Sequence, residues 1–260
     1  MKYISKLAGK RVVIVGGTSG IGFGTAEACI EYGAIVTVAS SQQAKIDKTI
    51  QRIKTSYPDA AERISGHVCD LSSPDLEANI KALLDFATAN GEYKLDHVVS
   101  TAGDSYGLTT LADATAEKIQ AHGQVRFVGS VLLAKVAMQY LNKSNTSSYT
   151  MTSGVKATKP SAGWSILAGW GAANEGLTRG LAIDMAPVRV NCVAPGAVDT
   201  ELFDSFGEGR RQGIVDFYKS ASLTRSVASP EDIAESYTYL MKDTFVTGTV
   251  LHSDGGHTLI

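Results

Sequence analysis

The sequence predicts an α/β fold in which one domain is built around a doubly wound parallel sheet. Short apolar runs alternate with amphipathic stretches from one end of the chain to the other, which is typical of parallel strands joined by helices. A glycine-rich turn follows the first of these runs. The chain has 260 residues, of which 44% are hydrophobic, so it can bury one large core. No repeat or linker divides it, and we expect residues 1–260 to form a single domain.

The first half of the chain contains four of the predicted strands. Arg11–Val15 is rich in β-branched residues, and a helical pattern follows it over 21–32 and ends at Gly33. Ser73-Pro74 places a capping hydroxyl before a proline, which favours the start of a helix there. The other elements predicted in this half are a helix at about 44–57 and strands at 35–39, 64–69 and 97–100.

The second half continues the same alternation. A long helical pattern covers about 115–141, and a helix rich in small residues covers about 165–185. Ser229-Pro230 predicts the start of the last helix by the same reasoning as Ser73-Pro74. The remaining predicted strands are 149–152, 189–193 and 249–252.

The balance of charge argues against polyanionic partners. Lys plus Arg number 24 and Asp plus Glu number 26, so the chain has no basic excess to attract nucleic acid or an anionic membrane. No stretch reaches the ~18 apolar residues of a membrane span, and the start resembles no signal peptide. The cysteines and histidines lack metal-ligand spacing, so we expect no metal site. We expect a cytoplasmic protein that acts on a small molecule.

The turn after the first strand reads Val-Gly-Gly-Thr-Ser-Gly-Ile-Gly over 15–22. Glycines at 16, 20 and 22 allow a tight turn, close approach of the backbone to a pyrophosphate, and close packing of helix on strand. The free N–H groups and the positive dipole end of the next helix would bind the phosphates. This context predicts a dinucleotide site of the Rossmann type, with a plain glycine turn as the alternative. The residues expected to contact the cofactor here are Gly16, Thr18, Ser19, Gly20, Ile21 and Gly22.

The glycine spacing resembles that of the short-chain dehydrogenase/reductase family, and later segments resemble that family's landmarks in order. Cys-Asp-Leu at 69–71 resembles the acidic residue that meets the adenine, and Ser-Thr-Ala-Gly at 100–103 resembles the family's Asn-Asn-Ala-Gly. Pro-Gly-Ala-Val-Asp-Thr at 195–200 resembles the segment that cups the nicotinamide, and Asp-Gly-Gly at 254–256 matches near the end. The resemblance covers nearly the whole chain. It implies further cofactor contacts from Asp70, Leu71, Thr101, Ala102, Gly103, Pro195, Gly196, Val198 and Thr200.

The end of the second strand favours NADP(H) over NAD(H). A carboxylate there would hydrogen-bond the ribose of NAD and repel a 2′-phosphate. This chain has Ser40 and Ser41 at that place, with Lys45 nearby and no acid before Asp47. Hydroxyls and an ammonium can donate hydrogen bonds to a 2′-phosphate. An arginine, the usual partner of that phosphate, is absent here.

The catalytic pattern departs from the family it resembles. Typical members carry Ser, Tyr and Lys, with an Asn from the long helix. Here Ser153 falls on the serine and Arg126 on the asparagine, whereas Leu167 and Gly171 fall on the tyrosine and lysine. Between residues 149 and 218 there is no tyrosine, and the only lysines are at 156 and 159. The usual alcohol–ketone chemistry is therefore not expected.

The set is similar to that of atypical fungal reductases of secondary metabolism, such as the reductase/Diels–Alderases of the malbrancheamide and paraherquamide alkaloid pathways. The matched positions are Arg126 and Trp164, while the aspartate that those enzymes carry three residues earlier falls on Ser161. Asp104 is a further carboxylate that could face a cation. The resemblance implies reduction of an iminium or an activated C=N or C=O group, with a coupled cyclisation left open. Ion pairing for Arg126, packing for Trp164 and a plain strand-end hydroxyl for Ser153 are the alternatives.

The segment at about 201–222 holds the position of the family's substrate lid. Its apolar side chains, which include Leu202, Phe203, Phe217 and Tyr218, indicate a hydrophobic substrate, with an amphipathic helix pair over the sheet edge as the alternative. The resemblance also implies a homo-dimer or homo-tetramer formed through the long helices. Two other functions stay open: a non-redox cyclase or isomerase that uses the dinucleotide structurally, and a dinucleotide-binding protein without catalysis.

Overall fold

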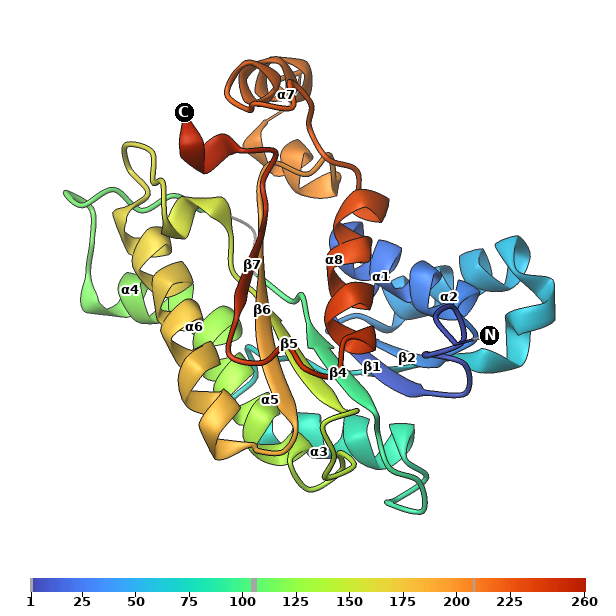
Figure 1. Cartoon of the computed structure of the whole chain (residues 1–260). Coiled ribbons are helices and arrows are strands. Elements are labelled where there is room, and N and C mark those ends of the chain that lie inside the picture. Colours follow the sequence, from blue (N-terminus) through green and yellow to red (C-terminus); the bar gives the residue numbers. More distant parts are fainter. Residues whose placement is uncertain (1, 104–106, 208) are drawn as a thin grey trace.

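Seven parallel strands form one sheet in the order β3-β2-β1-β4-β5-β6-β7. The computed structural model describes residues 2–103, 107–207 and 209–260. The chain proceeds outward from β1 to β3 and then returns to β4 beside β1, so the strand order reverses between β1 and β4 (Figure 1). The predicted doubly wound sheet is confirmed, and its reversal point is where such sheets bind ligands. The strands are β1 (Arg11–Val15), β2 (Ile35–Ser40), β3 (Ile64–Val68), β4 (His97–Ser100), β5 (Ser148–Thr152), β6 (Arg189–Pro195) and β7 (Val250–Ser253).

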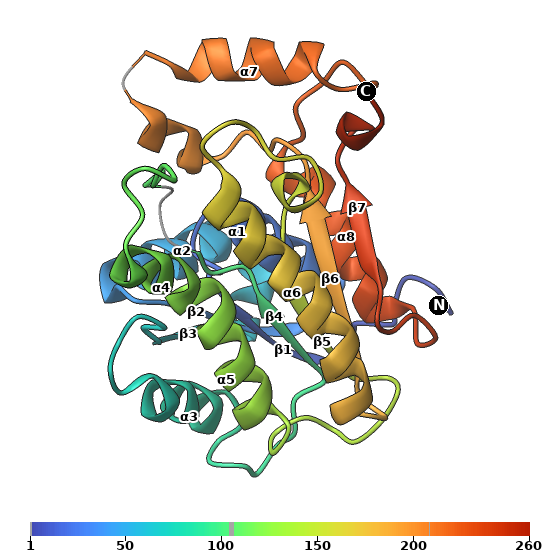
Figure 2. The ribbon, with the colours of Figure 1, turned by 90° about the vertical axis from the view of Figure 1, so that its left-hand side faces the viewer.

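Helices cover both faces of the sheet (Figures 1 and 2). In β1, Val12 and Ile14 pack in the cluster that α1 and α8 cover, whereas Val13 and Val15 pack in the cluster on the opposite face. A strand buried on both faces explains why the apolar runs are nearly continuous. On one face lie α1 (Gly20–Glu31), α2 (Gln43–Ser56) and α8 (Pro230–Lys242), and on the other lie α3 (Leu76–Ala87), α4 (Ala116–Gly123), α5 (Gly129–Ala137) and α6 (Ser165–Asp184).

The two Ser-Pro segments do different things. At Ser229 the hydroxyl accepts from the Asp232 N–H and the Asp232 carboxylate accepts from the Ser229 N–H, so a capping box begins α8 as predicted. At Ser73 the hydroxyl accepts from the Asp75 N–H in a local turn, and α3 begins only at Leu76. The predicted helix start at Ser73 is therefore wrong, because the short side chain bonds its own turn instead of capping the helix.

The long predicted helix is interrupted by a π-helical turn, η2 (Gln124–Val128), between α4 and α5. The backbone oxygen of Arg126 accepts from Asn174 Nδ2 at 3.1 Å and from the Ser130 hydroxyl at 2.7 Å. Side chains thus satisfy a carbonyl within the widened turn, which is how such turns persist inside helices. The turn places Arg126 at the edge of the cavity described below.

The segment over 201–222 consists of a short helical turn, η4 (Glu201–Phe206), and α7 (Arg211–Ser220). Figure 2 shows α7 lying across the carboxyl ends of the strands. Arg211 binds Asp199 at 2.8 Å and Asp204 at 2.7 Å, which ties the start of α7 to the chain before it.

Burial accounts for the three cysteines. Cys29, Cys69 and Cys192 are free thiols in the core, and burial raises the pKa of each to about 12. They pack as small apolar groups. Within the described residues no helix is long and apolar enough to cross a membrane. The same residues contain no cluster of three or more His, Cys, Asp or Glu side chains suited to a metal ion.

Candidate active site

A cavity of about 900 Å³ opens at the carboxyl ends of the strands, between the β1–α1 turn and the segment that carries α7. Every residue expected to contact the cofactor lines it, as do Arg126, Ser153 and Trp164. The tertiary structure therefore brings together segments that are far apart in the sequence. The cofactor set comprises Gly16, Thr18, Ser19, Gly20, Ile21, Gly22, Ser40, Ser41, Asp70, Leu71, Thr101, Ala102, Gly103, Pro195, Gly196, Val198 and Thr200.

The glycine turn is closed against neighbouring backbone. Gly16 has a φ of +89°, and a Cβ built on it would lie 2.5 Å from the Ala102 backbone nitrogen. A Cβ on Gly22 would overlap the Gly16 carbonyl. Only glycine fits these places, because the turn packs directly against neighbouring backbone, and these glycines add no side chain to the cavity that they line. A bare backbone beside a helix N-terminus is what a dinucleotide diphosphate needs, and the residues present fit that group.

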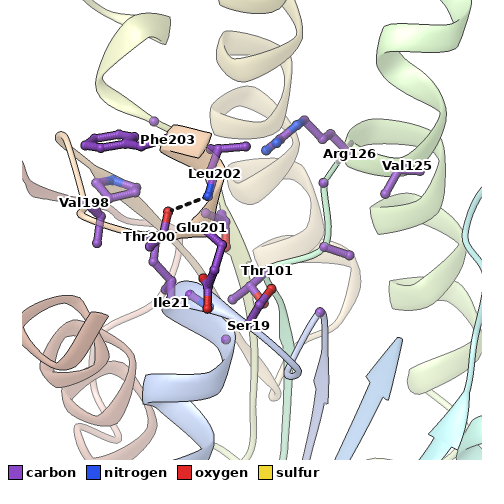
Figure 3. A pocket seen from close by; sticks show the side chains of 18 of the residues that line it. Ser19, Ile21, Thr101, Val125, Arg126, Val198, Thr200, Glu201, Leu202 and Phe203 are labelled. Atoms are coloured by element: carbon purple, nitrogen blue, oxygen red, sulfur yellow. Dashed lines mark hydrogen bonds between the residues drawn. The ribbon is translucent and has the colours of Figure 1, made fainter. Parts of the chain in front are cut away.

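The N-terminus of α1 already has one anion beside it. The Gly20 N–H donates to Glu201 Oε2 at 3.1 Å. Thr200, which caps η4, accepts from the Leu202 N–H at 3.3 Å (Figure 3). A carboxylate is stabilised at this positive end of the helix dipole, as a diphosphate would be. A cofactor diphosphate bound here would compete with Glu201 for the same N–H group.

The end of β2 presents hydroxyls and a cation to the cavity. Ser40, Ser41 and Lys45 line it, whereas Asp47 accepts from Gln43 Nε2 at 2.8 Å on α2 and is not among the lining residues. Asp70 lines the cavity and also accepts from the Ser72 N–H and hydroxyl, at 2.9 and 2.7 Å. The two interpretations of Asp70, an adenine contact and a local capping carboxylate, are thus compatible.

Leu167 and Gly171 line the cavity beside Ser153. A Cβ built on Gly171 would lie 3.5 Å from Ser153 Oγ and 3.0 Å from the Cβ of Ala157. The places of the family's tyrosine and lysine thus face the same space, and here they supply an apolar side chain and a bare backbone. Neither residue can donate a proton from its side chain.

Ser153 is held at the end of β5 by two acceptors. Its Oγ lies 3.1 Å from the Gly171 carbonyl oxygen and 3.0 Å from Glu175 Oε1, as a donor to them. A hydroxyl has one proton to donate, and either acceptor takes it. The lone pairs of Ser153 Oγ are what remains for a ligand in the cavity, so this hydroxyl acts as an acceptor.

Arg126 and Trp164 approach the cavity from different helices. The guanidinium of Arg126 packs against Gly103, where a Cβ would overlap it. Figure 3 shows this side chain extending from its helix toward Leu202. Trp164 caps α6, is half-buried, and donates its backbone N–H to the Ser161 carbonyl at 3.1 Å.

Of the other expected site residues, one lies outside the lining and one outside the described part of the chain. Ser161 is not among its lining residues, and its hydroxyl accepts from Lys156 Nζ at 2.8 Å. Asp104 lies outside the described residues. Sequence reasoning missed Lys156 and Asn174, which both line the cavity, and Glu175, which binds Ser153. Lys156 matches no motif spacing. The signal that could have identified it is that it is one of only two lysines between residues 149 and 218.

Aromatic side chains form the wall under α7. The rings of Phe203 and Tyr218 are nearly parallel, with centroids 6.4 Å apart. Phe217 meets Tyr218 edge-on at 5.2 Å. All three line the cavity, together with Trp164. By contrast, Trp170 donates to the Ile119 carbonyl at 2.9 Å and packs between α4 and α6 as a structural residue.

Comparison with known proteins agrees with this geometry. A family model described as an SDR-like Rossmann domain matches residues 3–260. The short-chain dehydrogenase/reductase ucsE of an Acremonium species is 42% identical over 253 residues, which make up 96% of this chain and 96% of that protein.

Solved structures give the same result. The MalC reductase/Diels–Alderase of Malbranchea aurantiaca has a TM-score of 0.93 and 41% identity to this chain and covers 99% of both chains. A short chain dehydrogenase of Burkholderia cenocepacia J2315 in complex with NADP has a TM-score of 0.83 and 26% identity over 97% of this chain and 99% of its own. These matches confirm the resemblance drawn from the motifs. With a family model along nearly its whole length, the chain belongs to the short-chain dehydrogenase/reductase family of oxidoreductases.

Proposed function

We propose that this chain is an NADPH-dependent reductase that delivers hydride to an iminium, or to a similarly activated C=N or C=O group, of a hydrophobic secondary metabolite. One observation carries the proposal: the positions of the family's proton-donating pair are Leu167 and Gly171, and the adjacent Ser153 is an acceptor. Bound NADPH would supply the hydride. The protein around the reacting carbon supplies no side-chain proton donor from these three positions.

The chemistry follows from the charge of the product. Hydride addition to a neutral carbonyl leaves an alkoxide, which needs a positioned proton donor. Hydride addition to an iminium carbon moves the C=N π pair onto nitrogen and leaves a neutral amine, with no proton required. The lone pairs of Ser153 suit a positively charged or N–H-bearing group at this place. In this proposal Arg126 and Trp164 orient the substrate, and the aromatic wall of η4 and α7 forms its lid.

NADP(H) is the proposed cofactor. The hydroxyls of Ser40 and Ser41 and the ammonium of Lys45 line the adenosine end of the cavity, and a 2′-phosphate would find donors there. The related Burkholderia structure contains NADP. The sequence identity of that relative is low, so the arrangement of this chain's own donors is the stronger support.

A cyclisation coupled to reduction is the second part of the proposal. The printed name of MalC joins reductase and Diels–Alderase. In this chain, Leu167 and Gly171 leave space where two long side chains would stand, and the 900 Å³ cavity includes the aromatic wall. Such a cavity suits a bulky substrate that must fold on itself. Detection of a cyclised product by mass spectrometry and NMR, after NADPH consumption, tests this part separately.

The primary test follows the absorbance of reduced nicotinamide with NADPH and with NADH, against cyclic iminium and ketone substrates. We expect NADPH to be consumed with iminium substrates and not with ketones. Arg126→Ala and Trp164→Ala should lower kcat/KM, whereas Trp170→Phe, outside the cavity, is the matched control. Tight NADPH binding without turnover of any substrate would contradict the proposal and favour the non-redox or non-catalytic alternatives.

Assembly into a homo-dimer or homo-tetramer stays a prediction. On α6 the positions of Gly169 and Gly180 have nothing within 4 Å of a built Cβ, so this helix offers an open surface of small residues. Another helix can approach such a surface closely. Light scattering coupled to size-exclusion chromatography measures the mass, and a monomer of 27.4 kDa would contradict the prediction.

A further inference from the structure

Lys156 is a cation in the substrate half of the cavity that the proposed reaction does not use. It lies on η3 (Val155–Ala157), three residues after Ser153, and it is half-buried and lines the cavity. Its ammonium donates to the Ser161 hydroxyl at 2.8 Å and lies 5.4 Å from the centre of the Tyr218 ring. The ammonium thus lies beside α7, which carries Tyr218.

Nothing in the described part of the chain neutralises this charge by an ion pair. The ion pairs found there join other residues, and the neighbouring titratable group that acts on Lys156 is another cation, Lys159. Partial burial, and then the charge of Lys159, lower the pKa of Lys156. An ammonium has three donors, and Ser161 takes one of them. A partly desolvated charge with donors to spare is stabilised by an added acceptor.

The side chains around Lys156 indicate which kind of ligand would carry such an acceptor. Tyr218 and Phe217 of α7, Phe203 of η4 and Trp164 line the same part of the cavity. The two carboxylates among the described lining residues are bonded elsewhere: Glu201 accepts from the Gly20 N–H at the N-terminus of α1, and Asp70 accepts from Ser72. Ring systems pack favourably on such a wall, and the ammonium favours an oxygen at the edge of the ring.

We propose that Lys156 is a specificity-determining residue that selects ring-containing substrates with an acceptor oxygen, such as a carboxylate, amide or ketone oxygen, at their α7 end, and that it disfavours a positive charge there. The inference rests on the proposed reductase function and specifies the end of the substrate that does not react. The two ends of the cavity then differ in polarity. Ser153 presents an acceptor to the reacting group, and Lys156 presents a donor to the opposite end.

Calorimetric titration of NADPH-saturated protein tests this without turnover. The probes are 2-naphthoate, 2-naphthamide and 2-naphthylmethylammonium, which share a ring system and differ in charge. We expect naphthoate to bind most tightly, naphthamide next and the ammonium most weakly. Lys156→Met should weaken naphthoate about tenfold, the loss of one charge-assisted hydrogen bond, and should not weaken the ammonium. Lys156→Arg should keep the order of the wild type.

Lys159→Met is the matched control, because Lys159 Nζ donates to the His257 carbonyl and does not line the cavity. It should change naphthoate binding less than twofold. Circular dichroism and NADPH affinity show whether each variant folds, and Lys156→Gln replaces Lys156→Met if the latter does not. The proposal would be overturned if none of the probes bound or if all three bound with equal affinity. It would also be overturned if the order of affinities stayed the same in Lys156→Met. Charge selection without NADPH consumption by any substrate would instead refute the reductase function alone.

Discussion

The cofactor half of the cavity is formed mainly by backbone, and the substrate half is formed mainly by side chains. In the cofactor half, β1, α1 and β4 meet through backbone, and Gly16 and Gly22 leave no room for a side chain. In the substrate half, β5, α6 and α7 meet through side chains, and Leu167 and Gly171 stand where the family's reacting pair would stand. The glycine turn of the family is therefore retained while the proton-transfer residues are exchanged. One fold can separate the two because they depend on different atoms.

The halves also differ in how they handle charge. The cofactor half offers oriented N–H groups and hydroxyls to an anion, besides the charged side chains of Lys45 and Asp70. In the substrate half the charges are the cations Arg126, against Gly103, and Lys156, near the Tyr218 ring. Changes in the first half should therefore alter cofactor affinity, and changes in the second should alter substrate preference. Four experiments test this division, from the largest expected effect to the smallest.

A side chain at position 22 should strongly weaken NADPH binding. In Gly22→Val the Cβ overlaps the Gly16 carbonyl, and overpacking of this kind costs about 1–3 kcal/mol or more, which is roughly fivefold to over a hundredfold if it appears in Kd. Titration of NADPH by its fluorescence measures the loss. Gly169→Val, with nothing within 4 Å of its Cβ, is the matched control and should bind NADPH normally. Unchanged affinity in Gly22→Val would mean that the turn does not hold the diphosphate.

Introducing the family's tyrosine and lysine at positions 167 and 171 should not introduce ketone reduction. In Leu167→Tyr/Gly171→Lys, the lysine Cβ lies 3.0 Å from the Ala157 Cβ, so we expect a loss of about 1–3 kcal/mol in the free energy of unfolding by urea. Ketone reduction should stay absent. Adding Ala157→Gly relieves the contact and should recover part of that stability. If the double variant reduced ketones at once, the two halves would be less independent than we infer.

The charge of Lys156 should give naphthoate binding a pH dependence. Its pKa is lowered by partial burial and by Lys159, so the ammonium is lost, as pH rises, before an exposed lysine would lose its proton. Affinity should fall in that range by up to about tenfold. Among the described residues, Tyr218 on α7 and His257 are further titratable groups at this site, and their rings lie 5.8 Å apart. Lys156→Arg should remove the dependence, because arginine does not titrate there.

Removal of the anion at the N-terminus of α1 should strengthen cofactor binding slightly. Glu201→Gln keeps the shape of the side chain but removes the charge that competes for the Gly20 N–H. We expect the Kd of NADPH to fall by roughly twofold to fivefold, in line with the strength of a charge at a helix terminus. Glu77→Gln on α3, which breaks an exposed pair with Lys135 of α5, should leave the Kd of NADPH unchanged. Weaker NADPH binding in Glu201→Gln would show that this carboxylate supports the cofactor.

Several elements could be predicted because their causes are local. The strand at 11–15 is found as predicted, and α8 begins at its capping box, because β-branched runs and capping side chains act over a few residues. The start of α3 could not be predicted, because the Ser73 hydroxyl accepts from the Asp75 N–H in a local turn and the helix begins only at Leu76. The π-helical turn at 124–128 could not either, since Asn174 of another helix satisfies one of its carbonyls.

The sequence by itself determined the family, the glycine turn and the absence of a tyrosine and a lysine at the reacting positions, because each depends on residue type and order along the chain. Only the tertiary structure decided which groups surround those positions. It turned the Ser153 hydroxyl into an acceptor through Glu175, and it brought Lys156 to Tyr218, 62 positions further along the chain. The physical reason is that a hydrogen bond's direction and a charge's neighbours are set by packing between distant segments, which no local pattern records.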